Sequence, residues 1–285
     1  VQDRISKILG RSDVAVRNVM EHLSASSGKH FRAYLLLAAA ADEADTVPAD
    51  AVNAAAALEM LHLATLVHDD VIDDAPLRRG QPSVQSRFGK KAAVLSGDYL
   101  FSLALTLLAD IAENYPVKYA EFSRAISQLC LGELSQYQHN HDPDLTIFSY
   151  LRIIAGKTAV LFSLAMYAGA ILNGDPEKEA RRLGRFGHCI GMHFQLADDC
   201  LDYEASTETM KKQTSKDLAE GVVTLPLIFA LATKPAWRDL VRQSDLAPAE
   251  IAAITTQVVA DGHVRQARNF AARYENRARR LLENV

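Results

Sequence analysis

The chain has 285 residues, of which 49% are hydrophobic and 23% are charged, as in a globular protein with a sizeable core. Its formal net charge of -4 excludes a general electrostatic attraction to nucleic acid or to an anionic membrane, so any basic cluster must be local. A small anion is therefore favoured over a polyanion as the binding partner.

The cysteines and the apolar segments indicate a cytoplasmic protein. Cys130, Cys189 and Cys200 are far apart, form no CxxC pair and have apolar neighbours, so we expect buried, reduced thiols. The N-terminal sequence VQDRISKILG contains no apolar signal core. The longest nearly apolar stretch, 158–172, is shorter than the roughly 18 residues that suggest a membrane-spanning helix, so we expect no transmembrane segment.

Long Ala- and Leu-rich segments, broken by short polar or Gly/Pro stretches, predict an all-α fold. We expect one domain over 1–285, without repeats or linkers. Pro48 and Asp175-Pro176 are helix start signals, and residues 75–82, with two prolines and a glycine, predict a loop. The predicted helices cover residues 12–25, 29–42, 48–73, 91–114, 117–140, 146–172, 176–204, 217–233, 247–261 and 264–284.

Two clusters of aspartates have the pattern DDxxD. They are Asp69, Asp70 and Asp73, and Asp198, Asp199 and Asp202. On a helix this spacing projects three carboxylates to one side, where they repel one another, so we expect a compensating cation. A solvated acidic turn is the alternative, but both clusters end strongly apolar segments. Mg²⁺ prefers such oxygen ligands and joins one or two carboxylates to substrate phosphates, so the pair indicates a metal-bridged diphosphate.

Basic side chains accompany both clusters, as a diphosphate site requires. Arg78 and Arg79 follow the first cluster, and Lys29 and Arg32 begin a predicted helix, where backbone amides also favour an anion. Two further lysines have ordinary alternatives. Lys157, followed by Thr158, lies on an apolar helix from which its ammonium group can reach water, and Lys212 lies in the polar segment 207–216, where a lysine is usually solvated.

Taken together, these residues resemble the trans-type polyprenyl (isoprenyl) diphosphate synthase family, over about residues 25–230. The matching motifs are Gly28-Lys29-x-x-Arg32, Glu59-Met-Leu-His62, His68-Asp-Asp-x-x-Asp73 with Arg78-Arg79-Gly80, Gly97-Asp98-Tyr99-Leu100, Gly132-Glu133-x-x-Gln136, Lys157-Thr158, Phe194-Gln195-x-x-Asp198-Asp199-x-x-Asp202 and Asp217-Leu218-x-Glu220-Gly221-x-x-Thr224-Leu225-Pro226.

The resemblance implies the isoprenoid synthase helical bundle with a deep central cavity, as a homodimer or as a heteromer with a small regulatory subunit. It implies condensation of an allylic diphosphate with isopentenyl diphosphate, with release of diphosphate. It also assigns roles. The six aspartates of the clusters hold several Mg²⁺ ions, some through water. The allylic diphosphate is contacted by Arg78, Lys157, Thr158, Gln195 and Lys212. Isopentenyl diphosphate is bound by Lys29, Arg32, His62 and Arg79.

The chain departs from the family pattern in two motifs. The usual GKRxRP has His30 and Ala33 here, which removes one arginine beside the expected isopentenyl diphosphate site. The usual GKPxGxD region contains Gln213 and Ser215, so we expect the flap over the second cluster to move differently. The chain also ends earlier than the resemblance leads us to expect, as if a final helix were absent or not included.

Other classes of protein remain as alternatives. Glu59-x-x-His62 is one ExxH pair of a di-iron carboxylate bundle, but we find no second pair. A terpene cyclase also uses DDxxD, but it has no need for a second diphosphate site. A non-catalytic partner subunit would not require two intact clusters.

The residues that precede the first cluster predict the product length. A chain growing along this helix from Asp69 first meets Ala64 and Thr65, and then Leu61 one turn further away. Aromatic residues at the first two positions close the cavity in the family, whereas Ala and Thr leave it open, although Ala64 also suits close helix packing. We therefore expect a C30–C40 all-trans product, with C35 favoured and C20 (geranylgeranyl diphosphate) as the alternative.

Overall fold

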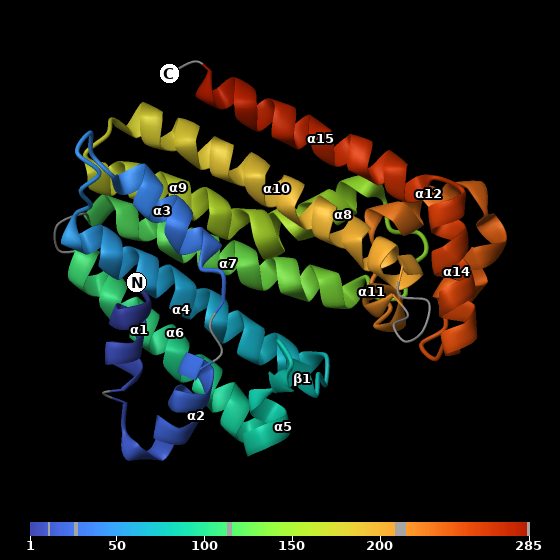
Figure 1. The fold of residues 1–285 in the computed structure, drawn as a ribbon, viewed down its shortest axis with the longest axis horizontal. Coiled ribbons are helices and arrows are strands. Elements are labelled where there is room, and N and C mark those ends of the chain that lie inside the picture. Colours follow the sequence, from blue (N-terminus) through green and yellow to red (C-terminus); the bar gives the residue numbers. More distant parts are fainter. Residues whose placement is uncertain (11, 26–27, 113–115, 209–214, 284–285) are drawn as a thin grey trace. The chain divides into compact units, whose positions relative to one another are not determined.

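Helices account for most of the described structure, which confirms the predicted all-α fold (Figure 1). The computed structural model describes residues 1–285 except residues 11, 26–27, 113–115, 209–214 and 284–285. The elements are α1 (Gln2–Leu9), α2 (Val14–Ala25), α3 (Phe31–Ala40), α4 (Ala49–Ile72), β1 (Leu77–Arg78), β2 (Gln81–Pro82), α5 (Val84–Phe88), α6 (Lys90–Ala112), α7 (Pro116–Gln138), α8 (Ile147–Ile154), the π-helix η1 (Ala155–Ala159), α9 (Val160–Asn173), α10 (Glu177–Glu208), α11 (Lys216–Ala219), α12 (Leu225–Thr233), the 3₁₀-helix η2 (Pro235–Trp237), α13 (Arg238–Val241), α14 (Pro248–Ala260) and α15 (His263–Leu282).

The chain divides into two compact units. The first unit comprises Val1–Ser123 and Leu164–Gly184, and the second comprises Arg124–Ser163 and Arg185–Val285. The unit boundaries fall within the helices α7, α9 and α10 rather than in linkers. A single domain over the whole chain stays a prediction.

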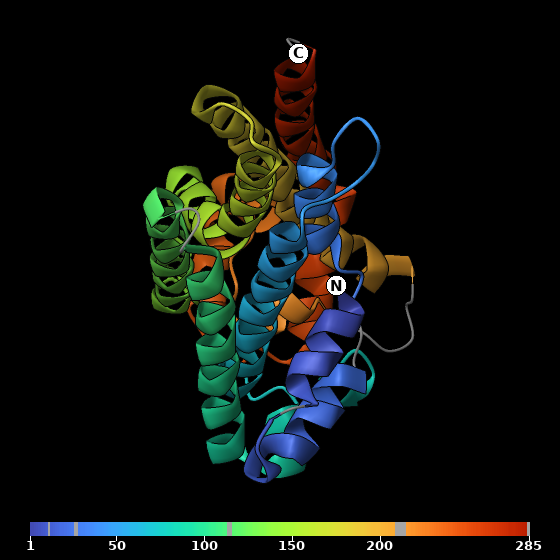
Figure 2. The same cartoon turned by 90° about the vertical axis from the view of Figure 1, so that its left-hand side faces the viewer.

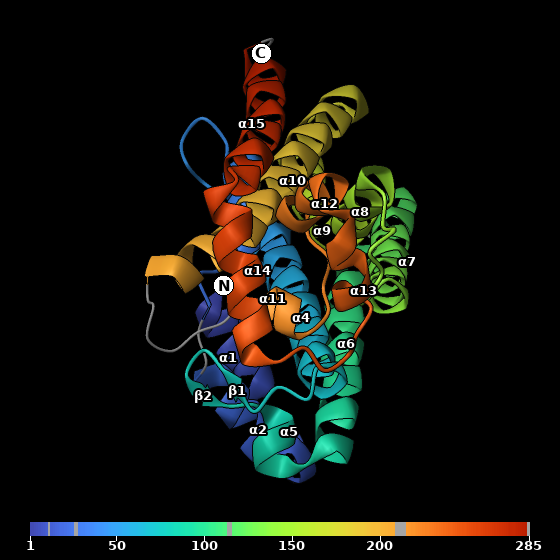
Figure 3. The same ribbon diagram turned by 90° about the vertical axis from the view of Figure 1, so that its right-hand side faces the viewer.

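Helix α4 is the central element of the first unit and packs along α6 (Figure 3). The residues from Ala54 to Ala57 are completely buried, because their small side chains allow neighbouring backbones to approach closely. Helix α1 packs against α4, and α2 contacts α5. Helices α1 and α2 are dark blue in Figure 2. This packing supports α4, whose C-terminal end carries the first aspartate cluster.

The sequence prediction was wrong for several short elements. Helix α1 is only eight residues long and was missed, although Ile5 and Leu9 bury its apolar face. The predicted loop 75–82 contains a two-stranded hairpin. The predicted helix 217–233 is interrupted, because Gly221 has a φ of 76° and Pro226 lies in the first turn of α12, where a proline needs no amide partner.

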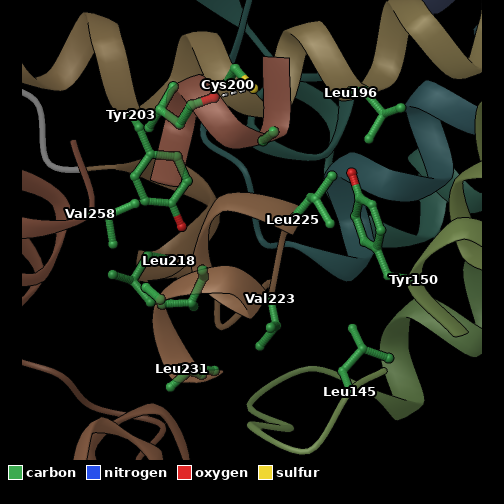
Figure 4. Close-up of a cluster of buried hydrophobic side chains, with 14 of the residues drawn as sticks. Leu145, Tyr150, Leu196, Cys200, Tyr203, Leu218, Val223, Leu225, Leu231 and Val258 are labelled. Atoms are coloured by element: carbon green, nitrogen blue, oxygen red, sulfur yellow. Dashed lines mark hydrogen bonds between the residues drawn. The ribbon is translucent and has the colours of Figure 1, made fainter. Parts of the chain in front are cut away.

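The second unit has an apolar core built around buried tyrosines. Tyr150 and Tyr203 lie among aliphatic side chains that include Leu196 and Leu225 (Figure 4). Helices α12, α14 and α15 pack against one another beside this cluster (Figure 3). Because each buried hydroxyl needs a polar partner, Tyr150 and Tyr203 connect the core to nearby polar groups.

The predicted cysteine environments are confirmed for two of the three residues. Cys189 and Cys200 are buried and free, whereas Cys130 is free and exposed. The apolar neighbours of Cys130 were misleading, since Leu129 is buried but the adjacent Leu131 is 63% exposed. On a helix, sequence neighbours point in different directions, so their character does not determine which face a residue occupies.

Three helical segments are long and apolar enough to cross a membrane by length and composition alone: Ala49–Ile72, Lys90–Ile111 and Ile147–Asn173. In the first and third, 67% and 78% of the apolar window is buried inside the protein, so packing accounts for their composition. In the second the share is 39%, and Leu95 and Leu105 are exposed on it. Helix α6 therefore presents an apolar face that the first unit does not cover.

Candidate active site

The first aspartate cluster lies where α4 ends. Asp69 is half-buried in the last turn, Asp70 is buried, and Asp73 is the exposed C-cap residue. Asp74 adopts a left-handed conformation with φ 51°, and the amide of Ala75 donates to the carbonyl of Asp70 at 2.9 Å. This is the usual geometry of a helix C-terminus, here with aspartate where glycine is common. It directs the chain away from the helix directly after the cluster.

Arg78 fixes the middle carboxylate of this cluster. Its Nε and one terminal nitrogen donate to Oδ1 of Asp70 at 2.9 and 2.6 Å. Because Asp70 is buried, the pairing neutralises a carboxylate that would otherwise be costly to desolvate. The structure thus brings together Asp70, which the sequence predicts as a metal ligand, and Arg78, which it predicts to contact the allylic diphosphate.

A tight turn places Arg79 opposite the start of α3. Strands β1 and β2 are joined by Arg79 and Gly80, both with positive φ, as in a two-residue hairpin turn. A Cβ atom on Gly28 would lie 2.8 Å from the Arg79 guanidinium, so the absence of a side chain at Gly28 permits this close approach. The hairpin, which the sequence did not predict, therefore brings Arg79 to the Gly28-Lys29-x-x-Arg32 segment.

The predicted isopentenyl diphosphate residues gather in the first unit. Burial lowers the pKa of Arg32 to about 10, against the opposing effect of the Glu59 carboxylate. Burial, followed by the guanidinium groups of Arg32 and Arg79, lowers the pKa of His62 well below its usual value. These residues interact electrostatically, whereas Lys29 is exposed. The result is a group of closely spaced cations with a neutral imidazole.

Glu59 organises this region and was not recognised as a site residue from the sequence. Its Oε1 accepts from the amide of Ala33 at 3.0 Å, and its Oε2 lies 3.1 Å from Nδ1 of His30. His30 and Ala33 are the departures from the family pattern, so a histidine paired with Glu59 stands where an arginine is usual. A small cavity of about 40 Å³ borders His30, Glu59 and His62.

The residues predicted to determine product length are buried in α4. Ala64 is fully buried, Leu61 is 1% exposed, and Thr65 is 8% exposed. The hydroxyl of Thr65 donates to the carbonyl of His62 at 2.8 Å, which is a common way to satisfy a threonine within a helix. Whether the growing chain follows this face stays a prediction.

In the second unit, a π-turn carries Lys157 and Thr158. Helices α8 and α9 are continuous through η1, which contains both residues. Gly132 of α7 packs so closely that a Cβ atom there would lie 2.5 Å from the amide nitrogen of Lys157. A π-turn inside a helix is frequent at functional sites, and the close glycine contact aligns it with α7. Lys157 Nζ lies 2.9 Å from Oε2 of Glu133.

A chain of hydrogen bonds connects this π-turn to the second aspartate cluster. Thr158 donates to the side-chain oxygen of Gln195 at 2.6 Å, and the Gln195 amide donates to Oδ1 of Asp199 at 2.7 Å. The buried hydroxyl of Tyr150 donates to Oδ2 of Asp199. Both carboxylate oxygens of Asp199 are thereby engaged by protein groups. Tyr150 was not predicted as a site residue, and its only sequence signal is its position seven residues before Lys157.

Asp202 holds the segment that follows the cluster. Its carboxylate accepts from the Ser215 hydroxyl, and from the backbone amides of Lys216 and Asp217 at 3.1 and 3.3 Å. Ser215 also caps the first turn of α11. This departure from the family pattern therefore adds a hydroxyl contact to Asp202. The predicted residues Lys212 and Gln213 lie outside the described residues.

Carboxylates accumulate around α10 and α11. Burial raises the pKa of Asp199 to about 6, and burial, reinforced by Asp202, raises the pKa of Asp198. Burial and the carboxylates of this cluster raise the pKa of Asp217 well above its usual value. A divalent cation would relieve this repulsion, so the donor set fits Mg²⁺.

The carboxylates do not converge into a complete metal cage. Among the described residues, no three His, Cys, Asp or Glu side chains are grouped closely enough to hold an ion alone. Mg²⁺ commonly retains water and binds through one or two carboxylates together with substrate phosphates. The arrangement therefore suits a metal that arrives with a phosphorylated substrate.

Comparisons with known proteins agree with this site. The polyprenyl synthetase family model matches residues 13–258. The chain is 36% identical over 268 residues to heptaprenyl diphosphate synthase component 2 of Geobacillus stearothermophilus, covering 93% of this chain and 82% of that protein. It is 43% identical over 230 residues to the all-trans-nonaprenyl-diphosphate synthase (geranyl-diphosphate specific) of Rhodobacter capsulatus, covering 80% and 70%.

A crystal structure extends the likeness to the fold. The polyprenyl synthase of Caulobacter crescentus CB15, complexed with calcium and isoprenyl diphosphate, superimposes with a TM-score of 0.88 at 34% identity. The superposition covers 99% of this chain and 87% of that one. Since the family model spans most of the chain and the relatives match over most of their length, the chain belongs to the polyprenyl synthetase family.

Proposed function

We propose that the protein is a Mg²⁺-dependent trans-prenyltransferase that condenses an allylic diphosphate with isopentenyl diphosphate and releases diphosphate. One observation carries this proposal: each DDxxD cluster is fixed beside its own polar or cationic partners. Arg78 holds Asp70 in the first unit, while Gln195 joins Thr158 to Asp199 in the second. Arg32 and Arg79 supply a further cationic group for a second diphosphate.

The clusters supply metal ligands and also residues that position them. Asp69, Asp73, Asp198 and Asp202 are the carboxylates we propose to face Mg²⁺, directly or through water. Asp70 and Asp199 are already bound by Arg78 and by Tyr150 with Gln195, so they contribute chiefly by fixing the clusters. When bound, Mg²⁺ would neutralise the charge that develops on the departing diphosphate.

The protein's own residues supply the remaining chemistry. Arg78, Lys157 and Thr158 stabilise the allylic diphosphate as its C–O bond breaks, which favours the transition state over the bound substrate. Arg32, His62 and Arg79 orient isopentenyl diphosphate, so that its double bond reaches the allylic carbon before water does. The departing diphosphate accepts the final proton, so no protein nucleophile is required.

The comparisons support a medium or long product. Heptaprenyl and nonaprenyl synthases are among the relatives, and Ala64 is a small side chain one turn before the first cluster. We propose a C30–C40 product, with C35 favoured, of the kind used for quinone side chains. The exposed apolar residues of α6 provide a surface for a second subunit in a cytoplasmic homodimer. Because one relative is named component 2, a heteromer is the alternative assembly.

The alternative classes lack support from the geometry. Glu59 binds His30 and the amide of Ala33, so it does not form an iron-binding pair with His62. A cyclase would not require the cations gathered around His62.

The direct test is incubation of the purified chain with radiolabelled isopentenyl diphosphate, Mg²⁺ and allylic primers of increasing length. We expect chain elongation with Mg²⁺ and none with a chelator present. Products are dephosphorylated and sized by chromatography. Absence of any condensation product with every primer would contradict the proposal, whereas cyclic hydrocarbons would identify a cyclase.

A further inference from the structure

Helix α15 concentrates positive charge in an otherwise acidic chain. It carries six arginines and a single glutamate, so its formal charge is +5 with His263 neutral, whereas the whole chain carries -4. The rest of the chain therefore sums to -9. The sequence excluded a general attraction to anionic surfaces, and α15 is the local exception.

The charge lies on the outer side of the helix. Val264, Ala267, Ala271 and Ala278 are buried on the opposite face, at spacings that mark one side of a helix. The arginines share the other side: Arg265, Arg268, Arg273, Arg277, Arg279 and Arg280, of which all but Arg268 are exposed. Figure 1 shows α15, in red, along one edge of the second unit.

Internal ion pairs use only part of this charge. Arg268 binds Glu204 of α10, and Arg279 lies 2.6 Å from Glu275. Within the part of the chain that the structure describes, no carboxylate pairs with Arg265, Arg273 or Arg277. A solvated helix face normally mixes both signs, so three exposed arginines without carboxylate partners indicate an external anion.

We propose that this arginine face adsorbs the protein to anionic phospholipid membranes. Guanidinium groups bind phosphate oxygens in pairs, which suits lipid headgroups. The apolar face of α15 is already buried, so the attachment is electrostatic and the helix does not insert. The acidic remainder of the chain is repelled by the same membrane, which orients the protein with α15 toward the lipid.

The chemistry of the proposed product favours a lipid surface over nucleic acid as the partner of the arginine face. This choice rests on the proposed function, because a C35 polyprenyl diphosphate has a long apolar tail that must pass from the protein into a bilayer. The arginine face carries no exposed aromatic ring, so it lacks the stacking platform of a single-strand binder. Adsorption at α15 would shorten the path from the enzyme to the bilayer.

The test is sedimentation of the whole protein with vesicles, without substrates, so that its outcome is independent of catalysis. Vesicles of phosphatidylcholine alone are compared with vesicles that also contain phosphatidylglycerol. We expect binding only to the second kind, and loss of binding at high salt. Since each arginine near an anionic surface contributes about a fivefold gain, the variant R265Q/R273Q/R277Q should bind roughly a hundredfold more weakly.

A matched variant changes the same charge elsewhere. K7Q/K91Q/K178Q removes three exposed lysines from α1, α6 and α10, and it should bind vesicles like the unaltered protein. Equal weakening in both variants, or no preference for phosphatidylglycerol, would overturn the proposal. Binding of a single-stranded RNA in place of the vesicles would overturn it as well. Both variants should retain condensation activity, because none of these residues is placed in the active site.

Discussion

Tyr150 on α8 donates a hydrogen bond to the buried carboxylate of Asp199 on α10, although 49 residues separate the two in sequence. Burial raises the pKa of Asp199 to about 6, and the bonds from Tyr150 and Gln195 favour its ionised form. The tyrosine thus positions a residue of the second DDxxD cluster from the apolar core.

Replacing Tyr150 with phenylalanine should therefore impair the active site more than the fold. The variant leaves one oxygen of a buried carboxylate without a donor, which costs about 1–3 kcal/mol of stability. We expect kcat to fall roughly ten- to a hundredfold, because a displaced Asp199 would no longer fix the neighbouring carboxylates that face the metal, with little change in KM for isopentenyl diphosphate. Steady-state kinetics and urea unfolding measure the two effects.

Tyr203→Phe is the matched control for this substitution. Tyr203 is also buried, and its hydroxyl accepts a hydrogen bond from Thr224 at 3.5 Å. It should lose some stability and retain kcat. Similar kinetics for Y150F and Y203F would show that the Asp199 contact has no catalytic importance.

The metal assignment predicts that Asp198 and Asp69 are needed for turnover but not for the fold. Asp198 is exposed on α10, so Asp198→Ala should leave the helical fold intact and reduce turnover roughly a thousandfold. Asp69→Ala should behave in the same way. Circular dichroism checks the fold, and the dependence of rate on Mg²⁺ concentration checks the cause. Near-normal activity in either variant would remove the basis for the metal site.

The two diphosphate sites should separate kinetically. Arg32→Ala removes a half-buried cation beside His62, so KM for isopentenyl diphosphate should rise roughly ten- to a hundredfold. Lys157→Ala should mainly lower kcat, because Lys157 acts where charge develops on the leaving group. Arg17→Ala, at an exposed position on α2, is the control. A uniform loss on both substrates in both variants would mean that the division of the sites is wrong.

His62 predicts a loss of stability in acid. Burial and the nearby guanidinium groups of Arg32, Arg79 and Arg78 lower its folded pKa well below the unfolded value of about 6.5. A carboxylate in this region, Glu59, acts on the pKa of Arg32. Below pH 6.5 the unfolded chain therefore binds a proton that the folded protein does not. The free energy of unfolding should therefore decrease as the pH is lowered below 6.5, and His62 contributes at most about 1.4 kcal/mol per pH unit to this decrease.

The comparison for this prediction is His62→Gln, which cannot titrate. Between pH 7.5 and 5.5 the unaltered protein should lose about 1 kcal/mol more unfolding free energy than the variant, because only the unaltered protein contains the titrating His62. Urea unfolding in one buffer series measures both curves. Parallel curves would contradict a neutral His62 in the folded protein.

The sequence was sufficient for the long helices and for the aspartate clusters, because apolar periodicity and a repeated DDxxD pattern are local signals. It did not predict the π-turn at Lys157, since that turn depends on the approach of Gly132 from another helix. Glu59 and Tyr150 were missed for a related reason. Each acts through partners distant in the chain, Ala33 and Asp199, and nothing beside them in sequence indicates those contacts.

The last prediction concerns product length and depends on Ala64. This residue is fully buried in α4, five residues before Asp69, so it lies about 7.5 Å from the first cluster along the helix axis. Ala64→Phe places an aromatic ring where later isoprene units are expected to pass, so products should shorten sharply while condensation continues. Overpacking costs about 1–3 kcal/mol, and Ala64→Leu provides a milder variant that should shorten products less. Products sized by chromatography give the answer, with thermal unfolding to confirm that each variant is folded. If folded A64F and A64L both made products of unaltered length, the growing chain would have to follow another face, and the C30–C40 prediction would lose its structural basis.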